Sequence, residues 1–343
     1  MSKKTTIYDI AKVLNITAAT VSRALNNNPR ISEDTKKLVQ KTAKKLNYKQ
    51  NSLALALKSG KSKNVGVVLP IINRNLFSNV IRGIEEELNP MGYNVIICQT
   101  HDDEKKEADI IQNLLNAQVD GIIMSIARHT KNTEHFEQIL KKNIPLIFFD
   151  RKIDVKGASS VTLDDFRGAY EATQHLIEQG CTKIAHFTVD RSVEIYRKRY
   201  EGYKQALLNN SVVFNEDYVL SLESKIESGK DAAKKLMELD IPPDAIFSAS
   251  DLGALGAIQY LKGIGVQIPQ DFCVVGFSNE PFTQFMELTI STVDQSPLLM
   301  GKTAAKVFLE QMNADNLKIE RRMVLSPSLK IRKSSSRLDY TPS

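Results

Sequence analysis

Apolar residues repeat with a helical period near the start of the chain. Four of them lie at positions i, i+3, i+4 and i+7 and form one stripe: Ile7, Ile10, Ala11 and Leu14. A stripe of this period predicts an amphipathic helix. Thr6 precedes the stripe and can cap the helix, with Asp9 completing a capping box. The pattern therefore predicts a short helix that begins directly after Thr6.

A second and a third helix follow after short breaks in this pattern. Thr17 can cap the second helix, and Ser32 can cap the third. The second helix turns three residues inward: Ala18, Val21 and Leu25. The third helix buries another three: Val39, Ala43 and Leu46. Two short helices joined by a three-residue turn and followed by a supporting helix predict an N-terminal all-α helix-turn-helix module.

From residue 64 onward, short apolar runs alternate with helical stretches. Eight runs are typical of buried strands: Val65–Leu69, Val95–Cys98, Gly121–Met124, Leu146–Phe149, Val161–Leu163, Ile184–Phe187, Ala245–Ala249 and Cys273–Phe277. Continuous apolar strands separated by helices predict parallel sheets covered on both faces. The alternation occurs twice. We therefore expect an α/β body of two doubly wound lobes, with a ligand between them at the carboxyl ends of the strands.

Charge divides the chain into a basic head and a mildly acidic body. The 343 residues include 46 Lys and Arg against 40 Asp and Glu, a formal net charge of +6. Through residue 63 there are fourteen basic and three acidic residues, so the head carries +11 and the remainder −5. A solvated lysine-rich face is the simpler interpretation. An excess of eleven charges in one short module favours a polyanion-binding head instead.

The outward face of the predicted second helix suits DNA. Arg23 can donate two parallel hydrogen bonds to a guanine. Thr20, Ser22 and Asn26 can reach phosphates or base edges. Many three-helix bundles bind no nucleic acid, and the pattern alone leaves both possibilities open. The charge of the head favours DNA.

Composition argues against several other classes of protein. No run of ~18 apolar residues is present, so we expect no membrane span. The first residues lack an apolar signal region, which predicts a cytoplasmic protein. Three widely spaced cysteines favour neither a disulfide framework nor a zinc site. Phosphate-binding loops, nucleophile elbows and metalloprotease motifs are absent from the sequence, so we expect no enzyme activity, no cofactor and no metal.

A short apolar segment and a polar linker join the head to the body. Residues 51–57 are typical of a helix, but an isolated helix needs ~12–15 residues to be stable in water. Leu53 and Leu57 lie at positions i and i+4, so two copies of the segment could pack face to face. Docking of this stripe on the body is the other interpretation. Residues 58–63 are polar and basic, as in a flexible linker.

Dense motifs extend over the head and the body. Those of the head are Ile7–Ala11, Thr17, Thr20–Asn26, Ile31-Ser32 and Leu46–Tyr48. Those of the body include Val119–Ile123, Ile144–Leu146, Asp150-Arg151, Ser250-Asp251 and Val275–Phe277. Together they resemble the lactose-repressor/galactose-repressor family of bacterial transcription regulators. The resemblance implies a dimeric regulator of the repressor type that binds a palindromic operator in double-stranded DNA, with its affinity controlled by a small carbohydrate-like effector.

The resemblance also implies a body like that of periplasmic binding proteins. We expect a helix-turn-helix domain over residues 1–50, a hinge over 51–63, and an effector-binding and dimerisation domain over 64–343. Lobe 1 would comprise residues 64–164 and 294–325, and lobe 2 residues 165–293 and 326–335. The chain would cross between the lobes near Asp164, Val293 and Leu325.

The expected DNA contacts follow from the motifs of the head and the hinge. In the family, the first two residues of the recognition helix help to set operator preference, and here both are alanines that offer only methyl contacts. A leucine matched by Leu57 wedges into the minor groove and kinks the duplex. The predicted contacts are Thr6, Tyr8, Thr17, Ala18, Ala19, Thr20, Ser22, Arg23, Asn26, Tyr48, Asn51, Ala54, Leu57 and Lys58.

The expected effector contacts lie in the body. Family residues matching Arg199 and Asp251 contact the effector, although a surface ion pair is the commoner role of any single Arg or Asp. The full predicted set is Asn75, Phe77, Arg151, Arg199, Asp251, Ser278 and Asn279. Ser278 stands where many sugar-responsive members carry an acid, so a sugar acid or sugar phosphate would be tolerated better. Glu280 swinging in to replace that acid is the alternative.

Two other functions share parts of this pattern. A transport-type sugar-binding protein would have the same body but would leave the basic head unexplained. A nonspecific, nucleoid-type DNA binder would not need a two-lobed body.

Overall fold

The computed structural model describes residues 5–48, 61–313 and 320–337. The chain forms two compact units, residues 1–62 and 63–343. The predicted hinge helix lies outside the described residues.

The first unit is a bundle of three helices: α1 (Ile7–Leu14), α2 (Ala18–Leu25) and α3 (Glu33–Lys45). Its core contains the predicted inward residues Ile10, Val21 and Val39, together with Ala24, which the sequence pattern did not single out. A capping box opens α1, because the Asp9 carboxylate accepts the Thr6 backbone N–H at 2.8 Å. The helix-turn-helix prediction is therefore confirmed.

The second unit contains two six-stranded sheets. The first has the order β11-β5-β4-β3-β1-β2 and is parallel throughout. The second has the order β12-β10-β9-β8-β6-β7 and is parallel except for β12, which runs antiparallel to β10. The α/β fold class is thus confirmed, with one antiparallel edge strand that the sequence did not predict.

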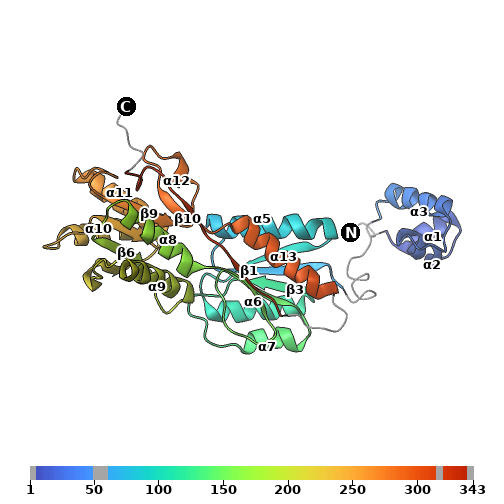
Figure 1. Ribbon diagram of the computed structural model, residues 1–343. Coiled ribbons are helices and arrows are strands. Elements are labelled where there is room, and N and C mark those ends of the chain that lie inside the picture. The colour runs from blue at the N-terminus through green and yellow to red at the C-terminus, as the bar shows by residue number, and fades with distance from the viewer. Residues whose placement is uncertain (1–4, 49–60, 314–319, 338–343) are drawn as a thin grey trace. The chain divides into compact units, whose positions relative to one another are not determined.

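Helices cover both faces of the first sheet (Figure 1). Helices α5 and α13 pack together on one face, and α6 and α7 lie on the other. Gly301 lets α13 approach α5 closely, because a Cβ there would lie 2.1 Å from the Val80 carbonyl oxygen. The elements of this lobe are β1 (Asn64–Leu69), α5 (Asn75–Leu88), η1 (Asn89–Met91), β2 (Asn94–Gln99), α6 (Glu104–Asn116), β3 (Gly121–Met124), α7 (Glu134–Lys141), β4 (Leu146–Phe149), β5 (Ser159–Leu163), α13 (Pro297–Asn313) and β11 (Arg322–Leu325).

The second sheet is covered in the same way. Helices α8 and α9 pack together on one face, and α10 and α11 form a pair on the other. The elements of this lobe are α8 (Asp165–Glu178), β6 (Ile184–Thr188), α9 (Glu194–Asn209), η2 (Glu216–Tyr218), β7 (Val219–Ser221), α10 (Ile226–Met237), β8 (Ala245–Ser248), α11 (Asp251–Gly263), β9 (Cys273–Phe277), α12 (Phe282–Phe285), β10 (Ser291–Asp294) and β12 (Ser328–Lys330).

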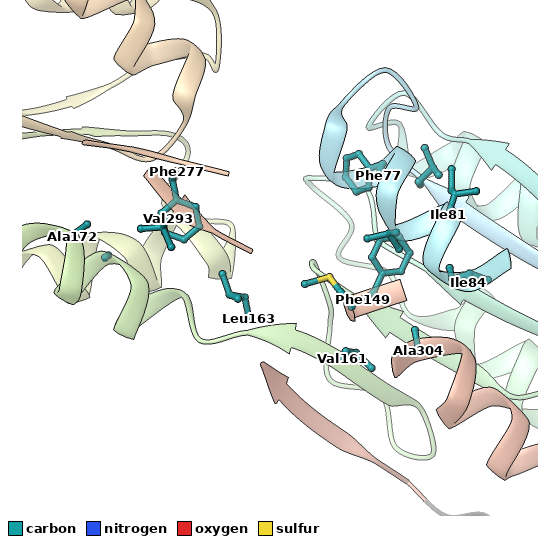
Figure 2. Close-up of a cluster of buried hydrophobic side chains, with 14 of the residues drawn as sticks. Phe77, Ile81, Ile84, Phe149, Val161, Leu163, Ala172, Phe277, Val293 and Ala304 are labelled. Carbon is teal, nitrogen blue, oxygen red and sulfur yellow. The ribbon is translucent and has the colours of Figure 1, made fainter. Parts of the chain in front are cut away.

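The chain crosses between the lobes three times: after β5, after β10 and between β11 and β12. Figure 2 shows buried side chains on both sides of the first crossing. Leu163, at the end of β5, lies between Val293 and Phe277 of one lobe and Phe149 of the other. The apolar core therefore continues through the segment about which the lobes would turn.

Candidate functional site

Local hydrogen bonds build the turn between α1 and α2. Asn15, directly after α1, takes a left-handed conformation with φ of 51°. Thr17 then caps α2, because its hydroxyl accepts the Thr20 backbone N–H at 3.1 Å. Val21 and Ala24 are fully buried and hold the inner face of α2 in the bundle. The outer face of α2 is left to solvent.

That outer face carries the predicted recognition residues. Ala19, Arg23 and Asn26 are exposed, whereas Ala18, Thr20 and Ser22 are half-buried. The Asn26 Nδ2 donates to the Ser22 carbonyl oxygen at 2.8 Å, at the end of the helix. Arg23 makes no ion pair with any residue that the structure describes, so its guanidinium is available to an external acceptor.

The remaining predicted DNA contacts differ in their surroundings. Tyr8 is 72% exposed, and Thr6 is exposed but donates its hydroxyl to the Asp9 carboxylate at 2.7 Å. Tyr48 packs on the core of the bundle, and this burial raises the pKa of its phenol. Four predicted contacts lie outside the described residues: Asn51, Ala54, Leu57 and Lys58.

A cleft lies between the two lobes at the carboxyl ends of their strands. From the first lobe it receives loops after β1, β2, β3 and β4, and from the second lobe loops after β8, β9 and β10. Its volume is about 750 Å³, including the part open to solvent. The charged residues that line it are Arg74, Asp102, Arg128, Asp150, Arg151, Arg199, Asp251 and Glu280.

Arg199 of α9 is held rigidly at the edge of the cleft. It is 3% exposed, and its Nε and Nη2 each lie 2.8 Å from Asp165 Oδ1. Its Nη1 donates to the Ala249 carbonyl oxygen at 2.9 Å, and the guanidinium lies 3.6 Å from the centre of the Phe277 ring. Burial raises the pKa of Asp165 to about 6. Its attraction to Arg199 therefore offsets only part of the free energy that the carboxylate loses on leaving water.

Asp251, the first residue of α11, is also fully engaged. Its Oδ1 accepts the Thr292 hydroxyl at 2.6 Å, and its Oδ2 accepts the Glu280 backbone N–H at 2.7 Å. A Cβ at position 276 would lie 2.2 Å from Oδ1, so Gly276 is required for this approach. Burial raises the pKa of Asp251 to about 7. The carboxyl group is thus positioned by three separate elements of the second lobe.

The backbone around the cleft takes unusual conformations at several non-glycine residues. Asp102 and Asp150 are left-handed, with φ of 60° and 57°. Ser278 has φ of 121°, a conformation that side chains other than glycine rarely adopt. Such strain gathers at sites where side chains must be aimed at a ligand.

Comparison with known families fits both units. The model described as bacterial regulatory proteins, lacI family, matches residues 6–51. The model described as periplasmic binding proteins and sugar binding domain of LacI family matches residues 62–331. The chain belongs to the LacI family. It is a transcription regulator with a helix-turn-helix DNA-binding head and an effector-binding body.

Relatives of this LacI-family chain match over 80% or more of its length. Catabolite control protein A of Priestia megaterium is 32% identical, over 91% of this chain and 94% of the relative. A solved LacI-family regulator from Enterococcus faecium with bound ribose is 26% identical, covers 80% of this chain and 100% of its own, and has a TM-score of 0.71. The lac repressor dimer bound to operator and the anti-inducer ONPF shares the fold, with a TM-score of 0.85 over 97% and 99% of the chains at 23% identity.

Five predicted effector contacts line the cleft of this LacI-family body: Phe77, Arg151, Arg199, Asp251 and Ser278. Phe77 is only 4% exposed and packs edge-on against Phe149, so little of its ring faces the cleft. The other two predicted contacts do not line it. Asn75 accepts a hydrogen bond from Asn79 within α5. Asn279 turns away to Asp294 and Arg332.

Sequence reasoning missed several residues of the cleft, among them Arg74, Asp102, Arg128 and Tyr196. Asp102 and Arg128 follow β2 and β3, so the rule that ligands bind at the carboxyl ends of parallel strands could have found them. Glu280 lines the cleft. This position is needed if Glu280 replaces the acid that many sugar-responsive members carry where Ser278 stands.

No group of three or more His, Cys, Asp or Glu among the described residues could hold a metal ion. No helix in the described part of the chain is long and apolar enough to cross a membrane.

Proposed function

We propose that the protein acts in the cytoplasm as a dimer that binds a palindromic DNA operator, and that a small carbohydrate-like effector in the cleft controls this binding. The outer face of α2 supports the proposal most directly. Its buried face is fixed by Val21 and Ala24, while Arg23 is exposed and unpaired among the described residues. An element that enters the major groove needs this arrangement.

The cleft supports control by an effector. Ribose is bound in the Enterococcus faecium relative, and a catabolite control protein and a ribose operon repressor each match 90% or more of this chain. A ligand changes DNA affinity only if it favours one arrangement of the lobes over the other. The cleft draws residues from both lobes, so a ligand there would select the angle between them.

Catalysis is not part of the proposal. Carboxylates hold two of the cleft's arginines in place, because Asp165 pairs with Arg199 and Asp102 pairs with Arg151. A transport-type sugar-binding role would use the same cleft but would not explain the presence of a DNA-binding head.

The decisive experiment is selection of DNA by the full-length protein from a random duplex library. We expect an enriched palindrome bound about 10³-fold or more tightly than scrambled duplex at physiological salt. Sedimentation of the complex should give two chains per duplex. Binding without any sequence preference would contradict the proposed function.

A further inference from the structure

One corner of the cleft holds two arginines beside a single ion-paired carboxylate. Arg151 Nη1 donates to Asp102 Oδ1 at 2.6 Å, and Arg128 Nη2 lies 3.8 Å from Asp102 Oδ2. The backbone N–H of Arg128 also donates to Asp102 Oδ1, at 3.1 Å. Asp102 therefore holds both arginines in place, and it is the only carboxylate within ion-pair distance of either among the described residues.

Both guanidinium groups keep a buried donor without a partner. The Nε atoms of Arg128 and Arg151 are buried, and neither has a hydrogen-bond acceptor among the described residues. Arg151 as a whole is 8% exposed. A buried charged donor without a partner destabilises the folded state, so folded proteins seldom keep two together without a use. Both side chains line the cleft, where a ligand would reach them.

Other carboxyl groups act on these arginines only through space, Asp150 on Arg151 and Asp190 and Glu223 on Arg128, and none accepts a hydrogen bond from either Nε atom. Asp150 forms no ion pair within the described part of the chain, and burial raises its pKa. Glu280 lies across the cleft near Arg74, and burial raises its pKa as well. Asp251 is held by Thr292 and by a backbone N–H. A raised carboxyl pKa favours the neutral form, which does not repel an anion.

We propose that the effector carries an acidic group, a phosphate or a carboxylate, that binds between Arg128 and Arg151. The planar fork of a guanidinium matches both anions, and two such forks at one corner can receive several oxygens. This inference rests on the proposed function, because it names the chemistry of a ligand for the same cleft. It does not depend on the observation that Ser278 stands where many sugar-responsive members carry an acidic residue.

Substitutions at the corner give effects of opposite sign. Arg128→Gln removes one fork and should weaken binding of inorganic phosphate about tenfold. Asp102→Asn keeps an acceptor for Arg151 but removes the competing charge, so it should tighten phosphate binding at least about threefold. A role in structure alone would not make one change weaken and the other strengthen binding. Arg167→Gln is the matched control, because Arg167 is exposed on α8 and pairs with Glu171 outside the cleft.

Phosphate binding to the full chain is measured by calorimetry and by thermal shift, with chloride used to hold ionic strength constant. The basic head also attracts phosphate, so the contrast between Arg128→Gln and Arg167→Gln decides the result. Equal phosphate affinity in wild type, Arg128→Gln and Arg167→Gln would overturn the proposal. Weakening by Asp102→Asn would overturn it too, as would a wild-type protein that binds neither phosphate nor acetate.

A second set of titrations distinguishes the two anions. Glucose, glucuronate and glucose 6-phosphate share one ring and differ in their acidic group, and acetate and phosphate test the anions alone. Preference for the phosphate or the carboxylate member supports the proposal and names the source, whereas preference for neutral glucose contradicts it. Operator selection without any effector is measured separately, so failure of the proposed function remains distinguishable from failure of the anion site.

Discussion

Replacing Asp165 by alanine should destabilise the body strongly. Arg199 is 3% exposed, and Asp165 is the only carboxylate within 4 Å of it among the described residues. Breaking a buried pair by removing one partner typically costs about 3–5 kcal/mol, because the other charge stays buried without compensation. The remaining contacts of Arg199, with the Ala249 carbonyl and the Phe277 ring, do not neutralise its charge.

Removing both charges should cost less than removing one. Burial raises the pKa of Asp165 to about 6, as expected when an ion pair offsets only part of the free energy lost on leaving water. Asp165→Ala combined with Arg199→Met should therefore be more stable than Asp165→Ala alone. Glu171→Ala, which breaks the exposed pair with Arg167 on the same helix, should change stability by less than about 0.5 kcal/mol.

Urea titration followed by circular dichroism measures these differences in the free energy of unfolding. They are read from the shift of the urea midpoint, provided that the dependence of the free energy on urea concentration is unchanged. The reasoning is refuted if Asp165→Ala costs no more than Glu171→Ala. It is also refuted if the double variant is less stable than Asp165→Ala, because the buried charge would then not be the source of the cost.

Three further predictions concern the head, the helix contact and pH. Arg23→Ala should cost about 1–3 kcal/mol of operator-binding free energy and relax the preference at one base pair per half-site. Lys37→Ala should instead weaken binding to all duplexes alike and flatten the salt dependence of DNA affinity. Unchanged base preference of Arg23→Ala in a selection experiment would contradict the assignment of Arg23 to base recognition. Gly301→Ala should destabilise the body by about 1–3 kcal/mol in urea, because the added methyl would meet the Val80 carbonyl oxygen; an unchanged midpoint would show that the helices separate freely. Burial raises the pKa of Asp251 to about 7, above its unfolded value, so its contribution to stability is present below about pH 4 and is lost as pH rises to about 7. Asp251→Asn should remove up to about 1.4 kcal/mol per pH unit from that slope, and parallel wild-type and variant profiles would argue against it.

Periodicity determined much of the fold without any tertiary information. The helical stripes around Ile10, Val21 and Val39 correspond to α1, α2 and α3, and all eight apolar runs correspond to strands within two residues. Burial on both faces leaves a continuous apolar signal in parallel strands. Strands β7, β10, β11 and β12 were missed because they have only three or four residues and several are polar or exposed.

Only the tertiary structure decided which charged residues meet in the cleft. Arg199 and Asp165 are 34 positions apart, and Asp102 and Arg151 are 49 apart, so no local pattern pairs them. The sequence predicted Asn75 and Asn279 as contacts, and in the structure they do not line the cleft but form hydrogen bonds with Asn79 and Asp294. Local spacing encodes which face of an element is buried. The partners of a buried charge depend on how sheets, crossovers and loops bring distant strand ends together.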